Sequence, residues 1–177
     1  IAVITLDDIY DEETAKIADK YNVKTTHFLL SYKINHKTNK NRDYGLHFDK
    51  GYGSIEKQIS QFGRKIGRRP RISRNHRLLW LSDNLDLTYL AMNGFAIDSS
   101  KIGTKPYLLC VEGKILPIWE VPFSVYEFLA QNSLHAAYQS AKDFTQLFKQ
   151  EVTPIVALLH PRCLETKYNF KSELDRF

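Results

Sequence analysis

The sequence opens with IAVITLDD (residues 1–8), in which a short apolar and β-branched run stops at two adjacent aspartates. A run of this length and composition is typical of a buried strand. A similar run near the other end of the chain, PIVALLH (residues 154–160), stops at a histidine. Buried strands that end in polar residues favour a parallel sheet with its chemistry at one edge.

Helical patterns separate the strand candidates between these two runs. The clearest helix follows Ser54, a good N-cap residue, and stops before Gly67, with Ile55, Ile59 and Phe62 on one face. This alternation predicts a single α/β domain over residues 1–177 with a mostly parallel sheet. Further helices are expected over 11–21, from 82 or 83 to 94, and over 132–150. The second of these has Leu85, Tyr89 and Met92 on one face. Strands are expected over 23–31, 44–48, 71–75, 95–98, 107–111 and 115–121.

The composition is that of a globular protein, with 43% hydrophobic and 25% charged residues in a chain of 177. No apolar run approaches the roughly 18 to 20 residues that a membrane span needs. Two cysteines, Cys110 and Cys163, are too few for a disulfide framework, which favours the cytoplasm over the periplasm. Because the chain begins directly with a strand, we expect its natural N-terminus to lie upstream.

The positive charge is concentrated in one stretch. Lys and Arg outnumber Asp and Glu by 25 to 20, and residues 63–77 (GRKIGRRPRISRNHR) hold seven Lys or Arg and no acid. Such a stretch either forms a solvated helix end and loop, or binds the phosphates of a nucleic acid, a nucleotide sugar or a lipid pyrophosphate. A nucleic-acid-binding module is disfavoured, because the stretch has no interleaved aromatic residues and the rest of the chain is not basic.

Polar residues suited to catalysis fall where strands are expected to end. The carboxyl ends of parallel strands meet at one edge, where α/β proteins build their active sites. One aspartate and two histidines form a ligand set for a divalent metal ion with positions left open for water. Each residue also has a structural alternative, since aspartate caps helices and a single histidine is more often a hydrogen-bonded structural residue. The candidates are Asp7, Asp8, His47, His76, Asp98 and His160.

Other residues and motifs narrow the choice of chemistry. Trp80 and Trp119 could stack on sugar rings, although core packing is the simpler expectation for both tryptophans and for His27. The sequence contains no glycine-rich phosphate loop, no paired-cysteine zinc motif and no GxSxG nucleophile motif. A metal site at the strand ends is therefore the main hypothesis for chemistry.

In their order along the chain, these motifs resemble those of the polysaccharide deacetylase family, the metal-dependent esterases that include chitin and peptidoglycan deacetylases. TLDDIY (5–10) resembles the first motif, GLHFDKG (45–51) the second and GRRPRISR (67–74) the approach to the third. FAIDSS (95–100) resembles the fourth motif and VALLHP (156–161) the last. The resemblance covers nearly the whole chain.

Two motifs depart from the family pattern. Gly51 stands where the second motif has a second histidine, and Asn75, His76 and Arg77 stand where the third motif has Pro-Tyr after its arginine. We expect His76 to replace the missing metal ligand. The competing possibility is a site that has lost its metal.

The resemblance implies an irregular (β/α) barrel with fewer than eight parallel strands, and hydrolysis of an acetamide with a divalent metal ion, for which zinc is the expectation. An arginine beside the base would keep it ionised through its positive charge. The site residues that the resemblance implies are the base Asp7, the metal ligands Asp8 and His47, the acid His160, and Arg74 with its partner Asp98 or Asp7. His76 joins them as the replacement metal ligand that we infer, which the family pattern does not supply.

Three hypotheses about function follow from these expectations. The first is an enzyme that deacetylates an N-acetylated sugar in bacterial surface polysaccharide (O-antigen, capsule or lipopolysaccharide) biosynthesis, with Trp80, Arg68 and Arg69 contacting a phosphate-bearing or otherwise anionic glycan. The second is an inactive relative that binds a glycan without cleaving it, and the third is a nucleic-acid-binding module on residues 63–77. Metal content separates the first two, because a relative without a ligand should retain little metal. The sugar, its linkage and carrier, and the oligomeric state stay open.

Overall fold

The computed structural model describes residues 2–20, 22, 24–34, 42–78, 84–126 and 154–160. The expected helix over 132–150, and the residues His36, Trp80 and Cys163, lie outside them. Among the described residues, no helix is long and apolar enough to span a membrane. The elements are β1 (Ala2–Asp8), α1 (Glu12–Lys20), β2 (Lys24–Leu30), η1 (Ser31–Lys33), β3 (Asp43–Phe48), α2 (Ile55–Ile66), β4 (Ile72–Asn75), η2 (His76–Leu78), α3 (Asn84–Met92), β5 (Ile97–Asp98), β6 (Tyr107–Val111), β7 (Lys114–Glu120), β8 (Val125–Tyr126) and β9 (Ile155–Leu159).

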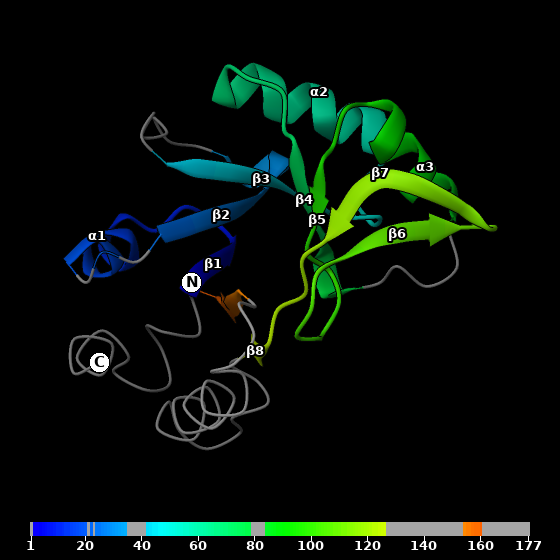
Figure 1. The fold of residues 1–177 in the computed structure, drawn as a ribbon. Helices are drawn as coiled ribbons and strands as arrows, with labels where there is room; N and C mark the ends of the chain where they lie inside the picture. Colours follow the sequence, from blue (N-terminus) through cyan, green and yellow to red (C-terminus); the bar gives the residue numbers. More distant parts are fainter. Residues whose placement is uncertain are drawn as a thin grey trace.

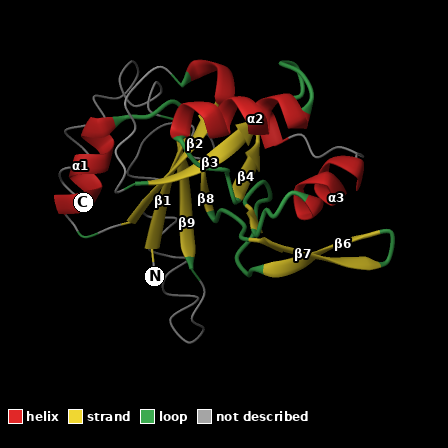
Figure 2. Cartoon of the chain, turned by 90° about the horizontal axis from the view of Figure 1, so that it is seen from above, coloured by secondary structure: helices red, strands yellow, loops and turns green. Residues whose placement is uncertain are grey.

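The described strands form one nine-stranded sheet in the order β6-β7-β5-β4-β3-β2-β1-β9-β8 (Figure 1). Neighbouring strands are parallel throughout, except in the β6–β7 hairpin at one edge. Helix α1 contacts β2, α2 contacts β3, and α3 contacts the hairpin (Figure 2). The predicted α/β domain with a mostly parallel sheet is confirmed.

The sheet curls because one short segment joins its two sides. β7 and β8 are far apart in the strand order, but only residues 121–124 separate them in sequence. Val121 N–H donates to the carbonyl of Asp98, the last residue of β5 (2.8 Å), and Ser124 N–H donates to the carbonyl of Val156 in β9 (2.9 Å). Phe123, between them, is fully buried. This segment therefore draws the sheet into the expected irregular (β/α) barrel.

The strand count depends on how the shortest strands are treated. β5 and β8 have only two residues each. The remaining parallel strands are β1, β2, β3, β4, β7 and β9, which agrees with the expectation of fewer than eight. With the two short strands included, the parallel set reaches eight.

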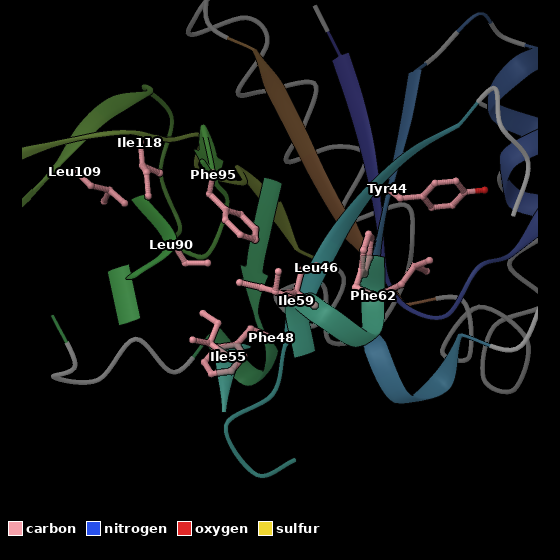
Figure 3. Close-up of a cluster of buried hydrophobic side chains, with 11 residues drawn as sticks. Tyr44, Leu46, Phe48, Ile55, Ile59, Phe62, Leu90, Phe95, Leu109 and Ile118 are labelled. Atoms are coloured by element: carbon pink, nitrogen blue, oxygen red, sulfur yellow. The ribbon is translucent and has the colours of Figure 1, made fainter. Parts of the chain in front are cut away.

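Helix α2 covers the middle of the sheet, and both of its ends follow the sequence signals. Ser54 Oγ accepts from the Lys57 N–H at 3.3 Å, and Gly67, at φ 80°, donates its N–H to the carbonyl of Gly63 at 2.9 Å. A left-handed residue at this position is typical of a helix end and favours glycine. The core that α2 and α3 form with the sheet consists of Leu29, Tyr44, Leu46, Phe48, Ile55, Ile59, Phe62, Leu90, Phe95, Leu109 and Ile118 (Figure 3).

Two expectations about side-chain burial are wrong. Met92 is 82% exposed, whereas Leu90 of the same helix is fully buried. Apolar residues lie on several sides of this helix, so their spacing does not identify the inner face. Trp119 is 48% exposed, because the alternation of β7 buries its neighbour Ile118 instead. The expectation that His27 is a core residue is confirmed.

Candidate active site

The carboxyl ends of β1, β3 and β4 bring polar side chains to one edge of the sheet. These strands belong to the parallel run β1-β2-β3-β4, in which His47 pairs with Arg74. Asp8 is the last residue of β1, and His76 follows β4 directly. We refer to Asp8, His47 and His76 as the metal cluster.

Asp7 and Asp8 both face His47 of the metal cluster although they are consecutive residues of a strand. Consecutive strand side chains normally point to opposite faces. Asp8 has a left-handed backbone with φ 74°, which is uncommon for a non-glycine residue and recurs at functional sites. His47 Nε2 lies 3.7 Å from Asp7 Oδ2 and 3.5 Å from Asp8 Oδ1. The backbone conformation at Asp8 thus allows both carboxylates to face one histidine.

The metal cluster offers three ligand atoms in a compact triangle. His47 Nε2 lies 3.1 Å from His76 Nδ1, and each of these atoms lies 3.5 Å from Asp8 Oδ1. A tetrahedral zinc ion with bonds of about 2.0–2.1 Å separates its ligand atoms by about 3.3 Å, which matches the triangle. Asp8 Oδ1 is buried and has no hydrogen-bond partner among the described residues, a situation that a bound cation would relieve. The residues present therefore fit a metal ion.

His47 is held in the form that binds metals. Its Nδ1 lies 3.1 Å from the carbonyl oxygen of Arg74, so an N–H at Nδ1 donates there and leaves Nε2 as the ligand atom. Burial lowers the pKa of His47 to about 4, despite the opposing effect of the Asp7 and Asp8 carboxylates. The imidazole is consequently neutral at neutral pH, as metal binding requires.

Arg74 is fully buried and holds Asp7 in place. Its Nη1 donates to Asp7 Oδ1 (2.8 Å) and Thr5 Oγ1 (2.7 Å). Its Nε donates to the Ser99 carbonyl (2.6 Å) and its Nη2 to Ser99 Oγ (2.8 Å). The guanidinium also lies 4.3 Å from the centroid of the Phe28 ring. Of the two pairings expected for this arginine, the one with Asp7 forms.

Asp98 lies on the other face of the sheet from Arg74. Its Oδ1 accepts from Ser73 Oγ at 2.7 Å, and Ser73 and Arg74 are consecutive residues of β4. This position corrects the expected catalytic role of Asp98 to a supporting one. Glu120, fully buried and in register with Asp98, was not expected at all. No motif surrounds it, and its only sequence signal is an acid at a position of β7 that alternation places inside.

His160 reaches the same edge of the sheet from β9. β9 pairs with β1 in a register that matches Leu159 with Leu6, so the next residue, His160, comes beside Asp7. Strand alternation puts it on the same face as Leu158, which is buried inside the curl. This placement agrees with the role expected from the sequence, which stays a prediction.

The basic stretch does not join the metal cluster. Helix α2 runs back across the sheet, so its last turn and the residues before β4 lie at the amino ends of the strands, opposite the cluster. Arg68 and Arg69 are exposed there and donate to the Arg42 carbonyl (2.9 Å) and to Asn93 Oδ1 (3.0 Å). The expectation that they contact substrate at this site is therefore wrong. The third expected substrate contact, Trp80, is outside the described residues.

No protein-family model matches the sequence, and no curated protein matches it by sequence. Solved structures share its fold. A probable polysaccharide deacetylase from Pseudomonas aeruginosa PAO1 aligns with a TM-score of 0.68 and 14% identity, covering 99% of this chain and 83% of that one. An allantoinase aligns with a TM-score of 0.69 and 12% identity, covering 99% and 82%.

A third structure is a mutant of a CE4 family pseudoenzyme with restored enzymatic activity. It aligns with a TM-score of 0.56 and 13% identity, covering 99% of this chain and 60% of that one. At these identities the alignments establish the fold. The chain has the fold of the polysaccharide deacetylases, as its motifs indicated.

Proposed function

We propose that the chain is a metal-dependent hydrolase that removes the acetyl group from an N-acetylated sugar. The observation that carries the proposal is the triangle of Asp8, His47 and His76 beside an aspartate held by a buried arginine. Polysaccharide deacetylases share the fold, and they act on acetylated glycans. Ligand type and spacing favour zinc as the ion.

An ion held by the metal cluster would polarise the acetyl carbonyl and lower the pKa of a water to about 7. We assign Asp7 the role of the base that accepts a proton from the attacking water. Its Oδ1 is occupied by Arg74, whereas its Oδ2 faces the cluster, 3.7 Å from His47 Nε2. A positioned base of this kind typically contributes about 10² to 10⁴ in rate. His160, beside Asp7 on β9, is the residue we assign to protonate the leaving amine.

The alternative is a relative that holds a glycan without cleaving it. Gly51 at the position of the usual second histidine favours this alternative, as does the fold shared with a pseudoenzyme. Gly51 is exposed in the turn after β3, and His76 lies beside His47 from the next strand. The position of His76 supports the enzyme over the inactive relative.

For the wider setting, we propose a cytoplasmic step in bacterial surface polysaccharide biosynthesis, acting on a phosphate-bearing or otherwise anionic glycan. The support is compositional: only two cysteines for the cytoplasm, and for the anionic glycan a net positive charge that attracts anions at long range, although its basic stretch lies away from the metal cluster.

The test is acetate release from N-acetylglucosamine oligomers by the zinc-loaded protein, with allantoin hydrolysis measured in parallel. We expect acetate release that Asp7→Asn abolishes, and no turnover of allantoin. Turnover of allantoin alone would assign the site to a different amide. Zinc-loaded protein that releases no acetate from any N-acetylated sugar would favour the glycan-binding alternative.

A further inference from the structure

We propose that Glu120 is a positioning residue for the Asp7–Arg74 pair and acts through residues 98–101. The inference rests on the proposed function where activity is the readout. The contacts that carry it are independent of that function.

Glu120 ends a row of polar side chains that crosses three strands. The registers pair Ser73 of β4 with Asp98 of β5, and Asp98 with Glu120 of β7. All three residues are fully buried, on the sheet face opposite Arg74. Asp98 Oδ1 accepts from Ser73 Oγ at 2.7 Å. The row therefore connects the strand that carries Arg74 with the strand that carries Glu120.

The Glu120 carboxyl group also fixes the chain just after β5. Its Oε1 accepts from the backbone N–H of Ser100 (3.0 Å) and of Lys101 (2.9 Å). On the other side, Ser99 N–H donates to the carbonyl of Ser73 at 3.0 Å. Ser99 is thus held from both directions, by Asp98 and Ser73 before it and by Glu120 after it.

Ser99 is the residue through which this arrangement reaches the site. It accepts two hydrogen bonds from Arg74, one at its carbonyl and one at its Oγ. Arg74 in turn donates to Asp7 Oδ1. A displacement of Ser99 would be passed to Arg74 and then to the base, and a misplacement of about 1 Å at a reacting group can reduce the rate about 10²-fold.

The charge state of Glu120 fits this role. Burial, followed by the charge of Asp98 and a hydrogen bond with it, raises the pKa of Glu120 to about 9. At neutral pH the group is an uncharged acid that can donate to the Asp98 carboxylate. The groups that face it are Asp98 in register on β5, Tyr107 in register on β6, whose pKa is also raised, and the backbone of residues 100–101. Ser73 lies one strand further along the same row, and helix α3 contacts β7.

The experiment compares Glu120→Gln and Glu120→Leu with the wild type. Glutamine keeps the acceptor for the Ser100 and Lys101 N–H groups but cannot ionise, whereas leucine removes that acceptor and both hydrogen bonds with it. Glu112→Gln is the matched control, because Glu112 is exposed at the turn of the same hairpin. The readouts are kcat and KM as functions of pH, and hydrogen exchange of the Ser100 and Lys101 amides.

We expect Glu120→Leu to lose about tenfold or more in kcat with little change in KM, and Glu120→Gln to stay close to the wild type. The wild type should also lose kcat as the pH rises through about 9, and this alkaline loss should be absent in Glu120→Gln. Ser100 and Lys101 should exchange slowly in the wild type and in Glu120→Gln, and fast in Glu120→Leu. Glu112→Gln should change nothing.

Amide exchange needs no catalysis, so the two proposals fail separately. If the wild type releases no acetate, the proposed function fails, and the exchange pattern still tests the tether between Glu120 and residues 100–101. Full kcat in a folded Glu120→Leu variant would overturn the positioning role. Equal exchange at Ser100 and Lys101 in all variants, or a loss in Glu120→Leu that glutamine does not avoid, would overturn it as well.

Discussion

Replacing Arg74 with alanine should destabilise the fold strongly, because Asp7 would be left buried without its cation. Arg74 is fully buried and donates hydrogen bonds to Asp7, to Thr5 and to two atoms of Ser99. Removing one partner of a buried ion pair typically costs about 3–5 kcal/mol. That is a large part of the roughly 5–15 kcal/mol by which a domain is stable.

Urea unfolding followed by circular dichroism measures this loss. With a slope of about 2 kcal/mol per molar urea, the midpoint should fall by about 1.5–2.5 M. The matched control is Arg68→Ala, since Arg68 is an exposed arginine whose contribution is expected to be below about 1 kcal/mol. A midpoint shift in Arg74→Ala no larger than in Arg68→Ala would refute the reasoning.

Two further variants test the site and the core. Asp7→Asn should keep its zinc while kcat for acetate release falls by about 10² to 10⁴, because Asp7 is assigned to proton transfer; loss of zinc would reverse the roles of Asp7 and Asp8. His27 is buried with both ring nitrogens unpartnered among the described residues, and burial lowers its pKa to about 4 from 6.5. Between pH 6.5 and 4 the imidazole of His27 is therefore protonated in the unfolded chain but neutral in the folded protein. This difference lowers the free energy of unfolding by up to about 3 kcal/mol as the pH drops from 6.5 to 4. His27→Phe should flatten this part of the pH dependence in urea titrations, and an unchanged slope would contradict the interpretation.

The sequence was sufficient to predict the residues whose position depends on local pattern. Asp7, Asp8 and His47 follow apolar runs, and parallel strands bring such ends together whatever the length of the connections. The ends of helix α2 were predicted from Ser54 and Gly67, because capping depends on neighbouring residues.

Non-local contacts set the limit of that prediction. The alternation of β4 and β5 separates Asp98 from Arg74, and a motif alone does not specify which face each residue takes. Glu120 acquires its importance only from strands that pair across the sheet. Gly45 is a further case: a Cβ there would lie 2.7 Å from the Phe28 ring, which itself packs against Arg74, and this packing has no local signature.

The most direct test of the account is the zinc content of the purified protein and of its His76→Ala variant, after loading with zinc and dialysis. His27→Phe serves as the control, because it removes a buried histidine outside the metal cluster. The account predicts one zinc ion per chain in the wild type and in His27→Phe, and a loss of affinity of at least about 10- to 100-fold in His76→Ala. A wild type that retains no zinc, or a His76→Ala variant that binds it with unchanged affinity, would contradict the metal cluster as described.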